Sequence, residues 1–110
     1  MTRTTVLAQD NAFKLGLFGA NCAGGLAITK APERWVESWD NNLAAARLAE
    51  AAGLEFMLPI ARWHGSRGEV NGQGSSLETL PWAAGLLAGP PDLAVFATIH
   101  VPFLNPVFAA

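Results

Sequence analysis

The chain has 110 residues, of which 51% are apolar and 15% are charged, and its formal net charge at pH 7 is −2. This composition argues against long disordered stretches, which combine few apolar residues with many charges. The seven Lys and Arg residues form no cluster. A basic nucleic-acid surface and a polybasic membrane anchor, which both need such a cluster, are therefore not expected.

One cysteine, Cys22, is present, so the chain cannot form an intrachain disulfide. The lack of disulfides is compatible with a reducing compartment such as the cytoplasm. No stretch approaches the roughly 20 apolar residues of a membrane-spanning helix. Residues 1–10 also lack the apolar core of a signal peptide. We therefore expect a cytoplasmic protein that does not associate with membranes.

The first third of the chain predicts a lead-in, a strand and a loop. Residues 1–12 are polar and lack periodicity, so we expect the domain to comprise residues 13–110. The short apolar run 13–18 predicts a strand, and the glycines within 19–25 are typical of the loop that follows.

A helix is predicted over residues 40–52, with Gly53 as its C′ residue and Leu54 packing back against it. Pro32 has the place of a first-turn proline if the helix starts earlier. The apolar face is expected from the residues that recur at helical spacing, which are Ala44, Leu48, Ala51 and Ala52.

A second strand is expected over residues 54–58, followed by a long loop over 59–76 and a helix over 77–87. Ser75 and Glu78 have the spacing of a capping box. Pro81 would remove one backbone hydrogen bond if it lies beyond the first turn. The expected core side of this helix comprises Leu80, Ala84 and Leu87.

A third strand is predicted over residues 93–99, because a nearly continuous apolar run suits a strand covered on both faces of a parallel sheet. After the loop 100–104, Asn105 and Pro106 have the pattern of an N-cap followed by proline at the first helical position. The order is therefore β-α-β-α-β with a further helix begun, joined by right-handed crossovers in a parallel α/β sheet.

The chemically versatile side chains follow the predicted strands. In a parallel sheet these positions share the C-terminal edge, where α/β proteins bind ligands. Cys22 is either a nucleophile or a small apolar filler, and His100 either binds a ligand or caps a carbonyl. Arg62 contacts an anion or ring edge, or is a solvated charge. Trp63 is a stacking or a packing residue. With His64 there are only two histidines, too few for a metal site.

Dinucleotide-binding, P-loop and nucleophile-elbow motifs are all absent from the sequence. Three segments instead resemble the luciferase-like flavin-dependent monooxygenases: residues 17–27 (LFGANCAGGLA), 48–63 (LAEAAGLEFMLPIARW) and 96–106 (FATIHVPFLNP). Within that family the chain most resembles the alkanesulfonate and dimethylsulfone monooxygenase branch. Pyrimidine-ring-opening monooxygenases are more distant.

The resemblance implies a TIM-type (β/α)8 barrel that uses reduced FMN and O2 to oxygenate a small organic substrate, a sulfonate or sulfone, with C–S cleavage. A flavin reductase would supply the reduced FMN, and the parent protein would be a homo-oligomer. A deazaflavin in place of FMN is the alternative cofactor. Ala61 and Arg62 match positions that contact FMN, and Asn21, Cys22, Thr98 and His100 match positions near the ring. This gives His100 and Cys22 as catalytic residues and Ala61, Arg62, Asn21 and Thr98 as cofactor-binding residues.

A complete barrel of this type has eight strands, whereas the sequence predicts three. Our first hypothesis is therefore that the chain is the N-terminal portion of such an enzyme, inactive alone. The alternative is a non-catalytic βα domain that binds flavin or a protein partner. A flavodoxin-like domain needs five strands and fits less well.

Overall fold

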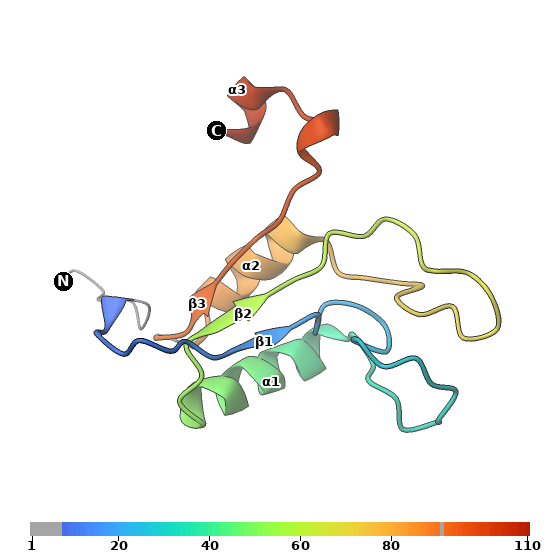
Figure 1. Ribbon diagram of the computed structural model, residues 1–110, viewed down its shortest axis with the longest axis horizontal. Coiled ribbons are helices and arrows are strands. Elements are labelled where there is room, and N and C mark those ends of the chain that lie inside the picture. Colours follow the sequence, from blue (N-terminus) through green and yellow to red (C-terminus); the bar gives the residue numbers. More distant parts are fainter. Residues whose placement is uncertain (1–7, 91) are drawn as a thin grey trace.

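Strands and helices alternate along the chain in the predicted order (Figure 1). The computed structural model describes residues 8–90 and 92–110, so residues 1–7 of the predicted lead-in lie outside the described residues. The elements are β1 (Gly16–Phe18), α1 (Trp39–Ala51), β2 (Phe56–Leu58), α2 (Thr79–Leu87), β3 (Ala94–Val95), a 3₁₀ turn (Val101–Phe103) and α3 (Pro106–Ala109). None of the helices formed by these residues has the length and apolar character needed to cross a membrane.

The three strands form one parallel sheet in the order β1-β2-β3, which confirms the α/β class. Met57 of β2 pairs with Leu17 on one side and with Val95 on the other. The strands are shorter than predicted. For β3 the reason is its place at the edge of the sheet. After the Phe96 amide donates to Met57, no further strand within residues 8–90 and 92–110 pairs with residues 97–99. The sheet is open, as expected for part of a barrel.

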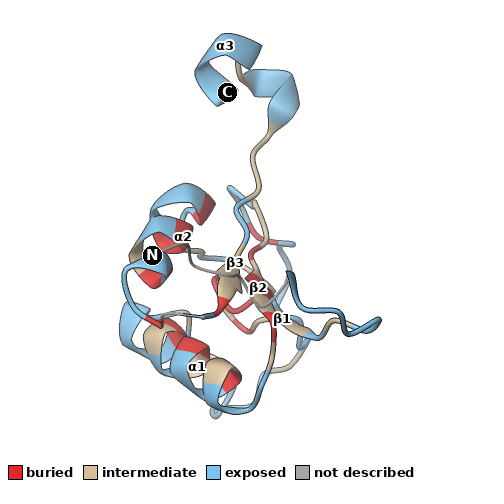
Figure 2. Ribbon diagram, turned by 90° about the vertical axis from the view of Figure 1, so that its left-hand side faces the viewer, coloured by how far each residue is buried: buried red, intermediate tan, exposed pale blue. Residues whose placement is uncertain are grey.

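Helices α1 and α2 cover the same face of the sheet (Figure 2). Met57 of β2 belongs to the core that these helices form with the sheet, and it is fully buried. Half of the residues in this core are alanines, whose small side chains let helices approach the strands closely. The buried cluster comprises Ala20, Ala46, Ala49, Met57, Trp82, Ala83, Leu86 and Leu93.

The predicted apolar faces of both helices are wrong. Leu48 is 71% exposed, and Leu80 is 51% exposed. The buried stripes are instead Asn42, Ala46 and Ala49 in α1 and Thr79, Trp82, Ala83 and Leu86 in α2. The first buried residue of each helix is polar, Asn42 in α1 and Thr79 in α2. The spacing of large apolar residues therefore does not identify the face that packs on the sheet.

The opposite face of the sheet carries aromatic side chains. Phe56 and Phe96 meet edge to face with ring centroids 5.6 Å apart. The Phe56 ring lies over Gly16, where an added Cβ would come within 2.2 Å of a ring carbon. Phe18 and Phe96 remain 47% and 42% exposed, so this face is only partly covered in the chain.

The helix ends follow local rules in most places. Gly53 has a φ of 81°, and the amides of Gly53 and Leu54 donate to Glu50 and Ala49, which is the Schellman motif predicted for the end of α1. Asn105 caps α3 as predicted, accepting from the Val107 amide at 2.9 Å.

Two other expectations about helix starts are wrong. Pro32 lies outside α1, whose N-cap is Ser38. The capping box is also wrong, because the N-cap of α2 is Glu78, and the Ser75 hydroxyl donates to Glu37 instead. Since α2 starts at Thr79, Pro81 lies within the first turn, where amides lack helical partners, so it removes no bond.

Glu55 joins the segment before β1 to β2. Its carboxylate accepts from the Leu15 amide at 2.6 Å and from the Asn11 side chain at 2.6 Å. The Leu15 amide is the main cause of a lowered pKa of Glu55; burial opposes this and Asn11 adds to it.

Because the folded-state pKa of Glu55 lies below the ordinary 4.5, its stabilising effect is complete above that value. We expect the free energy of unfolding to fall as the pH drops from about 4.5 through the lowered pKa. Urea denaturation between pH 3 and 6 measures this loss. A Glu55→Gln variant should show a flatter profile, and an unchanged profile would contradict the role of Glu55.

Candidate functional site

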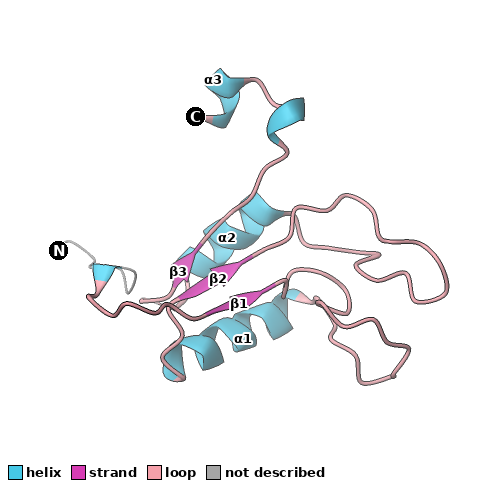
Figure 3. Cartoon of the chain, viewed as in Figure 1, coloured by secondary structure: helices cyan, strands magenta, loops and turns pink. Residues whose placement is uncertain are grey.

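The loops that follow the three strands all lie at the C-terminal edge of the sheet (Figure 3). Residues 19–38 follow β1 and residues 59–78 follow β2, and neither segment contains a named helix or strand. Residues 96–100 continue β3 toward the 3₁₀ turn. This arrangement brings the predicted site residues to one edge of the sheet.

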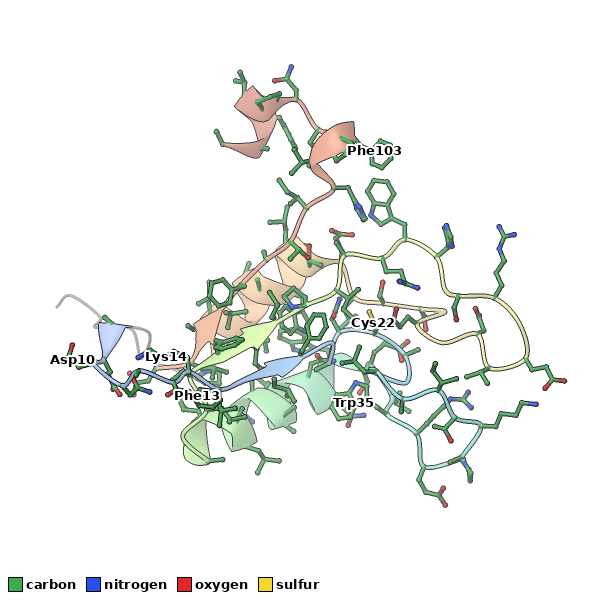
Figure 4. All side chains as sticks on the ribbon, in the orientation of Figure 1. Asp10, Phe13, Lys14, Cys22, Trp35 and Phe103 are labelled. Atoms are coloured by element: carbon green, nitrogen blue, oxygen red, sulfur yellow. The ribbon has the colours of Figure 1, made fainter. Side chains whose placement is uncertain are left out.

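An aromatic hollow of about 440 Å³ lies between the segments after β2 and β3. The Trp63 and His100 rings have centroids 4.3 Å apart, and the Phe103 ring lies 5.6 Å from Trp63. Figure 4 labels Phe103, which lies in the 3₁₀ turn that precedes α3. The hollow is lined by Ala61, Arg62, Trp63, His64, His100 and Phe103.

Two buried polar atoms in the segment after β3 have no hydrogen-bond partner among the described residues: Thr98 Oγ1 and His100 Nε2. Unpaired buried polar groups are costly, and in native proteins they often mark a place where a ligand or water completes the pairing. The Thr98 carbonyl, by contrast, accepts a hydrogen bond from the Thr79 hydroxyl. Thr98 and His100 therefore offer hydrogen-bonding capacity beside the aromatic hollow.

Arg62 is exposed and borders the aromatic hollow and two neighbouring ones. One neighbour, of about 300 Å³, also includes Gln73, Ser75 and Glu78. The backbone of Arg62 is fixed, because its carbonyl accepts a hydrogen bond from the Ser76 hydroxyl at 2.8 Å. No carboxylate is paired with its guanidinium in the described residues, which leaves a positive charge available for an anionic or electron-rich group.

Asn21 is fully buried below this edge. Its Nδ2 donates to the carbonyls of Ile60, at 2.9 Å, and Leu77, at 3.0 Å, and its Oδ1 accepts from the Ile60 amide at 2.9 Å. The side-chain amide is thus occupied by the protein's own backbone.

Cys22 is also fully buried, in the middle of the junction between the two loops (Figure 4). Its thiol faces the Asn21 side-chain oxygen at 3.7 Å and the Ile60 carbonyl at 3.9 Å. Burial raises the pKa of the Cys22 thiol above its usual 9.0, while the charge of Arg62 lowers it and that of Glu37 raises it to smaller extents. Low exposure and a raised pKa favour the packing alternative over the nucleophile.

We expect Cys22 in the folded protein to react at least tenfold more slowly with iodoacetamide at pH 8 than an exposed cysteine, since the thiolate is the reactive form. Mass spectrometry over time measures the rate. Denaturation in urea should restore fast alkylation. Rapid alkylation without urea would return Cys22 to the list of candidate nucleophiles.

The two long loops are joined across the edge. The Ala23 amide donates to Ser75, the Gln73 amide donates to Ala23, and Lys30 pairs with Glu69 between exposed side chains. The loop after β2 is also strained, because Arg67, Asn71 and Gln73 have positive φ angles of 64°, 43° and 59°. Such strain often accompanies functional sites.

The structure therefore brings Ala61, Arg62 and His100 to one hollow, with Thr98 beside it and Asn21 and Cys22 buried beneath. The sequence did not single out Phe103, Ser76 and Thr79, which line or fix this site. Phe103 stands in the quoted segment 96–106, which could have drawn attention to it. No group of three potential metal ligands occurs in the part of the chain that the structure describes.

Comparisons with known proteins support the resemblance. No protein-family model matches the chain. It is 31% identical over 104 residues to the FMNH2-dependent dimethylsulfone monooxygenase of Pseudomonas fluorescens. The aligned region covers 93% of this chain and 27% of that protein. It is 27% identical over 103 residues to the pyrimidine monooxygenase RutA of Methylorubrum extorquens. This alignment covers 94% of this chain and 28% of that protein.

A second RutA, from another strain of Methylorubrum extorquens, is 26% identical over all 110 residues, 29% of its length. The chain thus spans less than a third of the curated relatives it matches. Over nearly its whole length the chain is similar to these monooxygenases, which confirms the resemblance to luciferase-like flavin-dependent monooxygenases seen in the sequence.

Proposed function

We propose that this chain forms the flavin-facing side of a monooxygenase that uses reduced FMN and O2. The observation that carries the proposal is the hollow that Arg62 lines together with the rings of Trp63, His100 and Phe103. Two unpaired polar atoms belong to Thr98 and His100. Aromatic walls suit a planar ring, and convergent polar groups suit the heteroatoms at its rim. The names of both relatives support a monooxygenase reaction, and that of the dimethylsulfone monooxygenase supports reduced FMN as the cofactor.

Bound reduced flavin would supply the electrons that activate O2, and the chain's own residues would orient it. Trp63 and Phe103 would cover an aromatic face and exclude water. Thr98 Oγ1 and His100 Nε2 would hydrogen-bond to the rim of the ring. Arg62 would bring a positive charge to that rim, and the Ala61 position, which has no bulky side chain, would let the ring approach the backbone.

The substrate proposed for this site is a small organic molecule, with dimethylsulfone and pyrimidines as the first candidates because the relatives' names give them. A flavin reductase would be the partner that delivers reduced FMN. We further propose that residues 13–110 are the first three βα units of a TIM-type barrel whose other strands complete the cofactor site.

Arg62 provides the direct test. The whole translated protein, meaning the product of the complete reading frame that contains residues 1–110, is titrated anaerobically with reduced FMN. We expect Arg62→Ala to weaken binding roughly ten- to hundredfold, because a charge-assisted hydrogen bond contributes about 1.5–3 kcal/mol. Turnover of dimethylsulfone and of a pyrimidine, with a reductase present, is measured in parallel.

Arg47 on α1 supplies the matched control, since Arg47→Ala removes the same charge from an exposed helix residue. Its affinity for reduced FMN should stay within twofold of the unchanged protein. Equal losses in both variants would indicate a general charge effect and remove Arg62 from the site. Absence of any flavin binding in the unchanged protein would favour the alternative, a non-catalytic domain that binds a protein partner.

A specific observation favours the alternative of a binding domain: the aromatic face of the sheet is partly exposed and could contact a protein partner. Reading the coding sequence beyond Ala110 separates the two. Further βα units in frame support the monooxygenase, whereas a stop codon directly after Ala110 supports the binding domain.

A further inference from the structure

The first residue of α2 and the segment before it contact the segments that follow all three strands. The Ser76 hydroxyl donates to the Arg62 carbonyl at 2.8 Å, after β2. The Leu77 amide donates to the Asn21 carbonyl at 2.8 Å, after β1. The Thr79 hydroxyl donates to the Thr98 carbonyl, after β3. This short segment therefore fixes the relative positions of the backbones that carry the candidate site.

Asn21 is the residue on which these contacts converge. Its side-chain amide pairs with both backbone polar groups of Ile60, and it also donates to the Leu77 carbonyl. Ile60 immediately precedes Ala61 and Arg62. Asn21 thus links the end of β1 to the start of the Arg62 segment and to the approach to α2.

Only a primary amide of this length satisfies all three groups, because it accepts once and donates twice. Leucine has nearly the same shape but makes none of these bonds, which leaves the Ile60 amide and the Leu77 carbonyl unpaired and the Ile60 carbonyl with only the Cys22 thiol, 3.9 Å away. Those backbone groups would have to move toward water or other partners. The Ile60–Leu77 spacing would then relax, and Arg62 would move with it.

We propose that Asn21 is a positioning residue that holds Arg62, through Ile60 and Leu77, in the place where it meets the cofactor. Its side chain does not contact the ligand in this role. The proposal rests on the proposed flavin function and assigns a task to a residue that lies below the aromatic hollow rather than in its wall.

The test compares Asn21→Leu with Asn42→Leu in the whole translated protein. Asn42 is the matched control, because it is also fully buried and its side-chain amide also makes three hydrogen bonds, to Glu37, Ser38 and Trp82. Two of those bonds go to carbonyls at the start of α1 and the third joins α1 to α2, so none of them involves Ile60, Leu77 or Arg62. The unfolding curve of each variant gives the fraction of its molecules that is folded. The dissociation constant for reduced FMN is then calculated from the concentration of folded protein alone.

Two readouts are needed. Hydrogen exchange of the Ile60 amide should accelerate at least tenfold in Asn21→Leu, relative to the amide of Ala52, the C-cap residue of α1, which donates to Leu48. In Asn42→Leu it should stay unchanged. The corrected dissociation constant for reduced FMN should rise at least tenfold in Asn21→Leu and less than twofold in Asn42→Leu.

Unchanged exchange at Ile60, or faster exchange without loss of FMN affinity, would overturn the positioning role. Equal loss of affinity in both variants would do the same, since it would point to general destabilisation. If the unchanged protein binds no reduced FMN, the proposed function fails instead, and exchange at Ile60 still decides whether Asn21 holds the Arg62 segment.

Discussion

Replacing Trp82 by alanine is expected to lower the free energy of unfolding by about 3–5 kcal/mol, the usual cost of removing a large core aromatic residue. Trp82 is 2% exposed and packs in the core between α2 and the sheet. Its indole Nε1 donates to Asn42 Oδ1 at 2.8 Å, which joins α2 to α1. Such a loss is a large part of the stability of a small domain, and urea denaturation measures it.

A double-mutant cycle separates the hydrogen bond from the packing. Asn42→Leu leaves the Trp82 N–H unpaired, and Trp82→Phe leaves Asn42 Oδ1 unpaired. Each single variant therefore carries the cost of a buried polar group, about 1–3 kcal/mol. The double variant should lose less than the sum of the two. Strict additivity would mean that the bond between the helices contributes no coupling energy.

Gly65→Ala is expected to have the second large effect, about 1–3 kcal/mol, by forcing apart two turns of the loop after β2. A Cβ at Gly65 would lie 2.6 Å from the Gly74 Cα and 2.5 Å from Asn71 Oδ1. Backbone atoms cannot give way as the end of a flexible side chain can. We expect faster proteolysis between residues 62 and 76 and a lower urea midpoint.

Gly72→Ala is the control within the same loop, because the nearest atom to its added Cβ is Ser66 Oγ at 3.3 Å. A flexible hydroxyl can turn aside, so the effect should stay below about 1 kcal/mol. Similar losses in both variants would show that the loop tolerates the close approach of Gly65 to Gly74.

The order of elements was predictable because it depends on local patterns. The apolar run at β2, the Schellman glycine Gly53 and the Asn105–Pro106 helix start each act over a few residues. Strand lengths and helix faces depend on neighbours instead. Leu48 and Leu80 are apolar and helical, yet they point away from a sheet whose position no local pattern reveals.

The candidate site was predictable to the same extent. Parallel strands put Arg62 and His100 at one edge, and the structure lines a single hollow with both. Burial of Asn21 and Cys22 could not be predicted, because it results from the loop after β2 folding back over the end of β1. The contacts of Ser76 and Thr79 were missed for the same reason, since their partners lie 14 and 19 residues away.

The register of the sheet also has a kinetic consequence. Paired residues of β1 and β2 lie about 40 residues apart along the chain, and those of β2 and β3 lie nearly as far apart. To pair two of these strands, the chain must first lose the entropy of closing a long loop, and only then do the strand contacts form. Strand pairing is therefore expected to be slower than helix formation. Since β2 takes part in both closures, we expect the rate-limiting step to be the docking of this strand, and Met57 at its centre to influence the folding rate most.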